Sequence, residues 1–398
     1  MARTGFSVKV SNTVMGTPPS VNANTMLIVP GTATTGSTFP IALDTPVLFK
    51  STDDLATHGV TEAGNPEVYR HVTGFYNPTA EVDNTGTYLW VVVVAVGTNG
   101  TSTIPTKLPG YMRATVVNGF QYRPRQIIIA NPISKTALAD YQSAIMSMYD
   151  EGFSTCAIIA GDNFMPEGAI DTSVSTLDDL STKKAGMIGV VIFTDKQNAV
   201  ACTGKVGGWM ASLSVGTSIG DTSLPAFGES LYMVDQGSAS EYVNTPCAQL
   251  SLDTINAIGD KQYIFPRTRP PKNGLWLNDG ATAEDPLTAL STLEAARTIA
   301  AMVDDLRAFY TPYINGRVPI DANGRTQSSY VDVVTSLARE NVIVPYIDSG
   351  DISDARITQT DLNDDFSGTR TWQVSLEILP APTLRWVNSF VFYVKKLN

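Results

Sequence analysis

Runs of β-branched and other apolar residues predict a sheet of buried strands in the first half of the chain. Such runs are typical of strands that are covered on both faces, as in parallel sheets. Four segments have this character: 88–96, 126–130, 155–160 and 187–193. The pattern typical of a folded domain begins at Thr25, with the sequence TMLIVPG. Residues 45–50 predict a short strand, and Ser51 or Thr52 is expected to cap a following helix.

Two segments in the same half have helical spacing. Residues 134–151 place Leu138, Tyr141, Ile145 and Met148 on one face, with Ser134 as the cap and Gly152 as the stop. A helix between two buried strands predicts a right-handed parallel α/β layer. Residues 198–213 also predict a helix, although they include Gly204, Gly207 and Gly208. We expect these glycines to let the helix pack closely against a neighbour, and the alternative is a flexible hinge.

The second half of the chain has a different pattern, which begins after the proline-rich residues 266–272. There Asp285 is expected to cap a long helix that starts at Pro286 and ends before Pro312. A second helix is predicted over 327–340, followed by the strand-like NVIVPYI, and residues 369–379 alternate as a half-exposed strand. The residues expected to face inward from the second helix are Tyr330, Val333, Val334 and Leu337.

Both ends of the chain read as short strands that are joined to the rest by proline-containing segments. One face of each strand is apolar, formed by Phe6, Val8 and Val10 at the start and by Phe390, Phe392 and Val394 at the end. The tethers or hinges contain Gly16, Pro18, Pro19, Pro380 and Pro382. The predicted organisation is an N-terminal arm (1–24), an α/β body (25–270), a C-terminal α+β domain (271–383) and a C-terminal arm strand (384–398).

The composition suggests that much of the surface is covered by other subunits or by uncharged polar residues. Only 16% of the 398 residues are charged, whereas 43% are apolar. The net charge of −11 and the lack of basic clusters argue against a nucleic-acid partner. The longest apolar run is far shorter than a membrane span, and the N-terminus has no apolar secretory core, so no membrane insertion or secretion is expected.

No residue pattern predicts a catalytic or metal site. Ser218 lies in a GxSxG match, but both histidines, His58 and His71, precede it, whereas a hydrolase of that type needs its histidine after the serine. The three cysteines are expected to be buried, reduced thiols, and they are too far from the histidines to form a zinc site. Asp361, Asp364 and Asp365 lack the spacing of a calcium loop and are expected to form a solvated turn. No phosphate-binding motif is present, so neither a metal nor a cofactor is predicted.

The order of these elements resembles that of contractile tail sheath proteins of bacteriophages, R-type pyocins and related injection particles. Four stretches carry the resemblance: PVLFKSTDDLATHGV (46–60), residues 127–152, GKVGGWMAS (204–212), and the C-terminal half with LEAARTIAAMVDDLRAFY (293–310) and the alternating strands. The resemblance implies a largely parallel α/β body, a C-terminal α+β domain that lines the inside of the sheath, and extended arms that add strands to sheets of neighbouring subunits.

The function that the resemblance implies is structural. Such subunits form stacked hexameric rings around an inner tube and contract to drive the tube through a target envelope, without a cofactor. The implied partners are further copies of the chain, the inner tube protein, and baseplate and tail-terminator proteins; the implied location is the producing bacterium's cytoplasm and then the assembled particle. Residues 327–340, with Asp332, Arg339 and Glu340, are a candidate tube contact. The alternatives are an α/β enzyme with a carboxylate site at the sheet's C-terminal edge, and a tube or baseplate protein.

Overall fold

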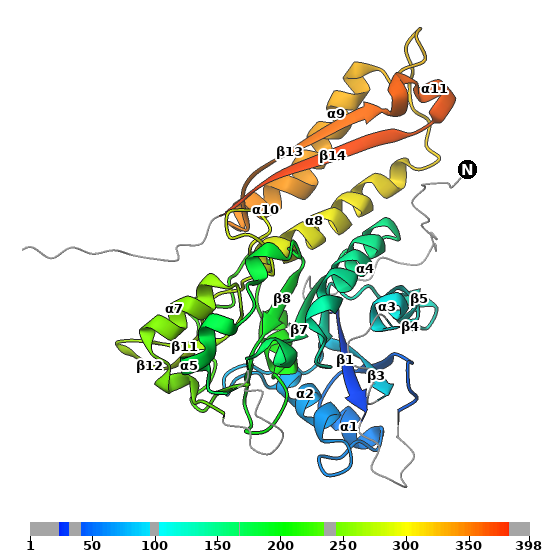
Figure 1. The fold of residues 1–398 in the computed structure, drawn as a ribbon. Coiled ribbons are helices and arrows are strands. Elements are labelled where there is room, and N and C mark those ends of the chain that lie inside the picture. Colours follow the sequence, from blue (N-terminus) through cyan, green and yellow to red (C-terminus); the bar gives the residue numbers. More distant parts are fainter. Residues whose placement is uncertain (1–23, 32–40, 96–102, 167, 235–243, 382–398) are drawn as a thin grey trace, which may run out of the picture.

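A six-stranded, mostly parallel sheet runs through the body of the computed structural model, which describes residues 24–31, 41–95, 103–166, 168–234 and 244–381 (Figure 1). The strand order is β2-β3-β1-β6-β7-β8, and only β2 is antiparallel to its neighbour. The strands are β1 (Asn24–Gly31), β2 (Val47–Phe49), β3 (Tyr88–Ala95), β6 (Gln126–Ile129), β7 (Cys156–Ala160) and β8 (Ile188–Val191). The mixed α/β class and the mostly parallel central sheet are therefore confirmed.

The four predicted central strands correspond to β3, β6, β7 and β8, and β1 lies between the first two of them. Leu27 of β1 is paired with Val91 on one side and with Ile128 on the other. All three side chains are fully buried, which explains why these strands read as continuous apolar runs rather than as alternating patterns.

Helices pack against this sheet and against one another. They are α1 (Asp53–Thr57), α2 (Pro66–Tyr76), α3 (Thr103–Arg113), α4 (Leu138–Asp150), α5 (Ile170–Ser173), α6 (Thr203–Ser212) and α7 (Leu252–Asp260). The predicted inward face of α4 is confirmed, because Leu138, Tyr141, Ile145 and Met148 are all buried. Gly152 follows α4 with φ of +88°, a conformation that suits a glycine after a helix.

The glycine-containing helix α6 begins at Thr203, later than the predicted Asn198, and it packs closely against α2. A Cβ atom added at Gly208 would lie within 3.0 Å of the backbone of Phe75, and one added at Gly204 would lie equally close to the backbone of His71. Close approach of two helices, rather than a hinge, therefore accounts for these glycines.

The remaining body strands form short pairs: β4 (Val116–Val117) with β5 (Phe120–Gln121), β9 (Phe193–Thr194) with β10 (Tyr232–Met233), and β11 (Pro266–Arg269) with β12 (Lys272–Leu277). The last pair occupies the proline-rich segment where a domain junction was expected. Leu275 and Leu277 of β12 belong to the same hydrophobic core as the central sheet, and this core extends to Ala296. A second core contains Ala301 and Met302 of α8 (Leu293–Tyr310) together with Val215, so α8 contributes side chains to both cores.

The predicted start of the long helix at Pro286 is wrong, because α8 begins at Leu293. Asp285 closes a turn instead: its carboxylate accepts a hydrogen bond from the amide of Leu287 at 2.9 Å, and the Leu287 side chain is 92% exposed. Thr292 is the cap of α8, since its hydroxyl accepts a hydrogen bond from the amide of Ala295.

The C-terminal unit packs α8, α9 (Ser328–Ala338), a π-helical turn (Arg339–Ile343) and α10 (Val344–Asp348) against the hairpin of β13 (Ile352–Asp361) and β14 (Trp372–Pro380); the short α11 (Phe366–Thr369) lies between the strands. Figure 1 shows this unit standing out from one side of the body, joined to it by α8. The alternating strand at 369–379 is confirmed as β14, with bounds that differ slightly from those predicted.

Two predictions in this unit are wrong. The segment NVIVPYI forms the π-helical turn and α10 rather than a strand, and Ile343 and Tyr346 face the core at helical spacing. On α9 only part of the predicted inward face is buried: Val334 is 1% exposed, whereas Val333 is 56% and Leu337 is 40% exposed.

Candidate assembly surface

Most of the residues predicted to link subunits lie outside the described part of the chain. This holds for Phe6, Val8, Val10, Gly16, Pro18 and Pro19 near the start and for Pro382, Phe390, Phe392 and Val394 near the end. Pro380 is described and is the last residue of β14, where it is paired with Ile352. The arms therefore stay predictions, whereas the β13–β14 hairpin, a surface that could receive them, lies within the described residues.

The β13–β14 hairpin has the pattern of a sheet with one covered face. Trp372, Val374, Leu376 and Ile378 of β14 are half-buried and alternate with exposed Gln373, Ser375, Glu377 and Leu379. On β13, Ala355 and Ile357 are buried against the small core of the unit. The opposite face is polar except for Leu379, which is 60% exposed.

Each strand of this hairpin has an edge without a strand neighbour among the described residues, because β13 and β14 pair only with each other. A free edge exposes backbone donors and acceptors that another extended chain can pair with. One acceptor of β13 is already used: the Arg339 guanidinium donates to the Ala355 carbonyl at 2.7 Å and to the Asp354 carboxylate at 3.1 Å. This contact involves one of the residues proposed to touch an inner tube, so Arg339 has a role within its own chain.

The far end of the hairpin is held in place by an aromatic cluster. The Trp372 ring lies 5.9–6.4 Å from the rings of Tyr310, Tyr313, Tyr330 and Phe366, measured between centroids. Its indole N–H donates to the Thr326 hydroxyl at 3.0 Å, and that hydroxyl donates to the Asp361 carboxylate at 2.6 Å. Asp361 was expected to be a solvated turn residue, but it connects β13 to the start of α9.

Two arginines on α8 form hydrogen bonds that connect the C-terminal unit to the body. Arg297 is 5% exposed and donates to the carbonyls of Met210 and Leu213, at the C-terminal end of α6, at 2.8 and 2.9 Å. Arg307 donates to the Tyr149 carbonyl near the end of α4 and to the Ser154 hydroxyl. A cation at the C-terminal end of a helix also interacts favourably with the helix dipole. These two contacts connect α8 directly to two helices of the body.

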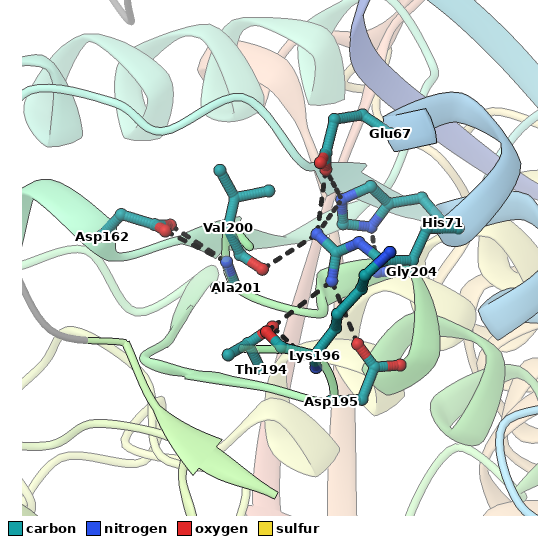
Figure 2. A network of polar contacts seen from close by, with 10 residues as sticks. Glu67, His71, Asp162, Thr194, Asp195, Lys196, Val200, Ala201 and Gly204 are labelled. Atoms are coloured by element: carbon teal, nitrogen blue, oxygen red, sulfur yellow. Dashed lines mark hydrogen bonds and ion pairs between the residues drawn. The ribbon is translucent and has the colours of Figure 1, made fainter. Parts of the chain in front are cut away.

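A network of charged side chains surrounds Arg70 at the carboxyl edge of the body sheet (Figure 2). The Arg70 guanidinium donates to the carboxylates of Glu67 at 2.9 Å and Asp195 at 3.1 Å, and to the Val200 carbonyl at 2.9 Å. His71 Nδ1 accepts a hydrogen bond from the Gly204 amide at 3.1 Å, which leaves Nε2 facing Glu67 at 3.5 Å.

The protonation of this network suits a structural role. Burial raises the pKa of Glu67, but the hydrogen bond from His71 and the charge of Arg70 outweigh it and lower the pKa to about 2. Burial and the Arg70 charge lower the pKa of His71, so its imidazole is neutral at pH 7. Arg70 satisfies both carboxylates and a carbonyl at once, so the network connects α2 to the loop before α6.

The other chemical candidates have structural explanations. The Ser218 hydroxyl accepts a hydrogen bond from the Gly220 amide at 3.3 Å and so stabilises its own turn. All three cysteines are buried thiols, as predicted, and burial raises the pKa of Cys156 to about 11. Within the described segments, no group of three or more His, Cys, Asp or Glu side chains could hold a metal ion. None of the helices in those segments is long and apolar enough to cross a membrane.

The sequence also matches a known family over most of its length. The family model described as DUF2586, N-terminal domain, matches residues 4–281. The chain belongs to the DUF2586 family. The matched region of this DUF2586 chain includes the body sheet and the Arg70 network, and it ends before α8 and the C-terminal unit. A search of curated proteins finds no match to the sequence.

Solved structures share the fold of the whole DUF2586 chain. A chain of the six-fold symmetrised baseplate of the anti-feeding prophage matches with a TM-score of 0.59 and 10% identity, over 100% of both chains. The contracted sheath complex of the extracellular contractile injection system PVC matches with a TM-score of 0.59 and 10% identity, over 100% of this chain and 98% of that one. A sheath tail protein from Listeria innocua matches with a TM-score of 0.52 and 12% identity, over 91% of this chain and 92% of that one. The predicted likeness to contractile sheath proteins is confirmed at the level of the fold.

Sequence reasoning found β14 of the candidate surface but missed β13. The inward positions of β13 include Ala355 and Gln359, whose side chains weaken the apolar alternation. The contacts of Arg297 and Arg307 were missed as well. Their partners are backbone carbonyls far away in the sequence, which no local pattern reveals.

Proposed function

We propose that this chain is a structural subunit of a contractile tail sheath, or of a related contractile injection particle. The observation that carries the proposal is the extent of the structural likeness: chains of two contractile particles match this one from end to end, including the C-terminal unit. A likeness confined to the α/β body would not distinguish a sheath protein from an enzyme, because parallel α/β sheets occur in proteins of many functions.

In this proposal, subunits polymerise as stacked hexameric rings around an inner tube and are linked by their arms. Phe6, Val8 and Val10 of one arm and Phe390, Phe392 and Val394 of the other would form strands that add to the free edges of β13 and β14 in neighbouring subunits. The segments with Gly16, Pro18 and Pro19 and with Pro380 and Pro382 would let the subunits rotate while they stay linked. Contraction would then follow from larger contacts between bodies in the contracted state, without a cofactor.

The proposed role is not enzymatic. The carboxylates at the sheet's C-terminal edge are the strongest enzyme candidate, and in this structure Glu67 and Asp195 are both paired with Arg70. The partners in the proposed role are further copies of the chain, an inner tube protein, and baseplate and tail-terminator proteins. The subunit would be made in the bacterial cytoplasm and then incorporated into the particle.

Electron microscopy of the purified chain in negative stain tests this role. We expect long tubular polymers, and we expect deletion of residues 1–22 or 384–398 to abolish them while the monomer stays folded by circular dichroism. A matched control is Asp171→Asn at an exposed site of the body, which should leave the polymers intact. A full-length chain that stays monomeric at high concentration would contradict the proposal.

A baseplate subunit is the second candidate, because two of the similar solved chains come from anti-feeding prophage baseplates. Such a subunit would form a closed ring rather than a long tube, since a ring has no free ends to extend. The same micrographs distinguish the two: tubes of many stacked rings support a sheath, and single six-fold rings support a baseplate part.

A further inference from the structure

A cleft of about 1150 Å³ lies on the body between the loop that follows α6, helix α7 and the β11–β12 pair. Its walls come from residues 216–222, from the second half of α7 with Gln262 beyond it, and from Arg267 and Arg269 of β11. Figure 1 shows α7, β11 and β12 together at one side of the body. Pockets for small molecules usually have volumes of about 300–1,000 Å³, so this cleft suits a short segment of polypeptide.

Arg269 gives this cleft a cation with spare donor capacity. Its Nη2 donates to the Asn278 carbonyl at 2.7 Å, which orients the guanidinium, while its buried Nε has no hydrogen-bond partner among the described residues. Burial lowers the pKa of Arg269, whereas the charge of Asp279 raises it. A bound carboxylate would favour the charged guanidinium further, because its two oxygens match the donor fork of an arginine.

Two amide side chains in the same walls have acceptors that are not used. Gln262 is 3% exposed and its Nε2 donates to the Gly259 carbonyl at 3.4 Å, but its buried Oε1 has no partner in the described part of the chain. The Oδ1 of Asn256 on α7 also lacks a partner there, and Asn256 is only half-buried, so its side chain can turn toward a ligand. Buried polar atoms nearly always have partners, so these acceptors beside an arginine indicate that another molecule completes the cleft.

The charges in the walls of the cleft restrict what this molecule can be. Asp221, Asp260 and Asp279 also line the cleft, so a polyanion would be repelled. A ligand that combines one carboxylate with neutral N–H donors fits the mixture, and an Asp or Glu residue within a peptide has both. Further copies of this chain offer such residues in excess, because the chain has 38 Asp and Glu residues but only 27 Lys and Arg residues.

We propose that this cleft binds an acidic side chain of a second copy of the chain. The Arg269 guanidinium holds the carboxylate, and the side-chain oxygens of Asn256 and Gln262 accept hydrogen bonds from amide groups of the bound segment. The choice of a second copy rests on the proposed function, in which subunits contact one another. The affinity of the cleft for a peptide carboxylate does not depend on it.

Titration of the full chain with N-acetylglutamate N-methylamide, followed by ligand-observed NMR where the protein is monomeric, tests the site. This probe carries one carboxylate and two amide groups. We expect Arg269→Gln to weaken its binding at least about tenfold, and Asn256→Ala to weaken it about three- to tenfold. Arg113→Gln, at an arginine whose side chain is 58% exposed, is the matched control and should bind the probe as the wild type does.

The uncharged analogue N-acetylglutamine N-methylamide separates the carboxylate from the rest of the probe. Its binding to the wild type should be as weak as that of the glutamate probe to Arg269→Gln. Equal binding of the two probes by the wild type, or binding of neither, would overturn the site. Where Arg269→Gln loses its fold by circular dichroism, Arg269→Lys takes its place, because it keeps the charge but not the donor fork.

Polymer formation tests whether a second copy supplies the carboxylate. Arg269→Gln should raise the protein concentration needed for polymers about tenfold, whereas Arg113→Gln should leave it unchanged. An unchanged threshold in a variant that no longer binds the probe would assign the cleft to a free carboxylate and overturn the second copy as its occupant. Absence of polymers from the wild type would contradict the sheath and the second copy together, while the titration would still decide whether the cleft binds a carboxylate.

Discussion

The central sheet and the β13–β14 hairpin are both β-structure, but they are stabilised in different ways. Strands β1, β3, β6, β7 and β8 are buried on both faces within one large hydrophobic core. The hairpin is covered on one face only, and its β14 side chains are half-buried at best. The separate core that it helps to form has nine buried residues. An isolated two-stranded hairpin is marginal in water and depends on a helix layer or on further strands.

This difference indicates which region is complete in a single chain. Four of the six body strands, β3, β1, β6 and β7, have a strand on each side, and only β2 and β8 lie at the edges of the sheet. In the hairpin, by contrast, neither strand has a second strand neighbour among the described residues, the core is small, and the tip is packed around Trp372. A surface that is held in place yet lacks strand neighbours is suited to receiving strands from other chains, which agrees with the proposed assembly role.

The largest expected change in the free energy of unfolding comes from truncating one side chain of equal size in each region. Ile128→Ala in the sheet should lower the free energy of unfolding by about 3–4 kcal/mol, because Ile128 is fully buried and leaves a cavity. Leu376→Ala in the hairpin removes as many carbon atoms from a half-buried site and should cost only about 1–1.5 kcal/mol. Urea unfolding of the monomer measures both. Equal losses for the two variants would show that the regions are equally well packed and would break the comparison.

The sequence revealed the body better than the hairpin for a physical reason. Strands that are buried on both faces must be apolar throughout, so β3 and β6 could be recognised from single runs of residues. In the C-terminal unit the core is thin, and small or polar residues such as Ala355 and Gln359 fill inward positions. The short apolar run at 341–347 fits a strand or a buried helix equally well, and only its neighbours decide between them.

The candidate surface was predictable in part. The alternation of β14 and the apolar faces of both arms are local patterns, and local patterns can be read along the chain. The attachment of α8 through Arg297 depends on the carbonyl of Met210, 87 residues away in the sequence, and such contacts are set by tertiary packing. The start of α8 was misplaced for a local reason, because the Asp285 carboxylate closes a turn with the same kind of hydrogen bond that caps a helix.

A smaller, pH-dependent change in the free energy of unfolding is expected from Asp162 in the body. Asp162 follows β7 and accepts a hydrogen bond from the Ala201 amide at 3.1 Å, yet burial raises its pKa to about 6. Between pH 4 and pH 6 the Asp162 carboxyl loses its proton in the unfolded chain but keeps it in the folded one. The free energy of unfolding therefore falls as the pH rises through this range, and it stays lower above pH 6. Asp162→Asn removes this loss and should raise the free energy of unfolding by about 1–2 kcal/mol at pH 7.5 but not at pH 4.

Unfolding of the wild type and of Asp162→Asn across pH 4–8 checks this expectation. The low pKa values of Glu67 and His71 act in the opposite direction, because their stabilising contributions are lost as the pH falls. They are present in both proteins and cancel in the difference. Asp171→Asn, at an exposed site, is the control and should leave the difference near zero at every pH. A difference between wild type and Asp162→Asn that does not change with pH would contradict the assigned pKa.

The smallest effect on the monomer should come from the outward face of the hairpin. Leu379 is 60% exposed, so Leu379→Ser should change the free energy of unfolding by less than about 0.5 kcal/mol. If neighbouring chains cover this face, the same change removes apolar contact between subunits and should raise the concentration needed for polymers about three- to tenfold. Ser375→Ala, on the same face of β14, should alter neither quantity. Unchanged polymer formation by Leu379→Ser would mean that this face stays exposed in the assembly, and the hairpin would then receive strands at its edges alone.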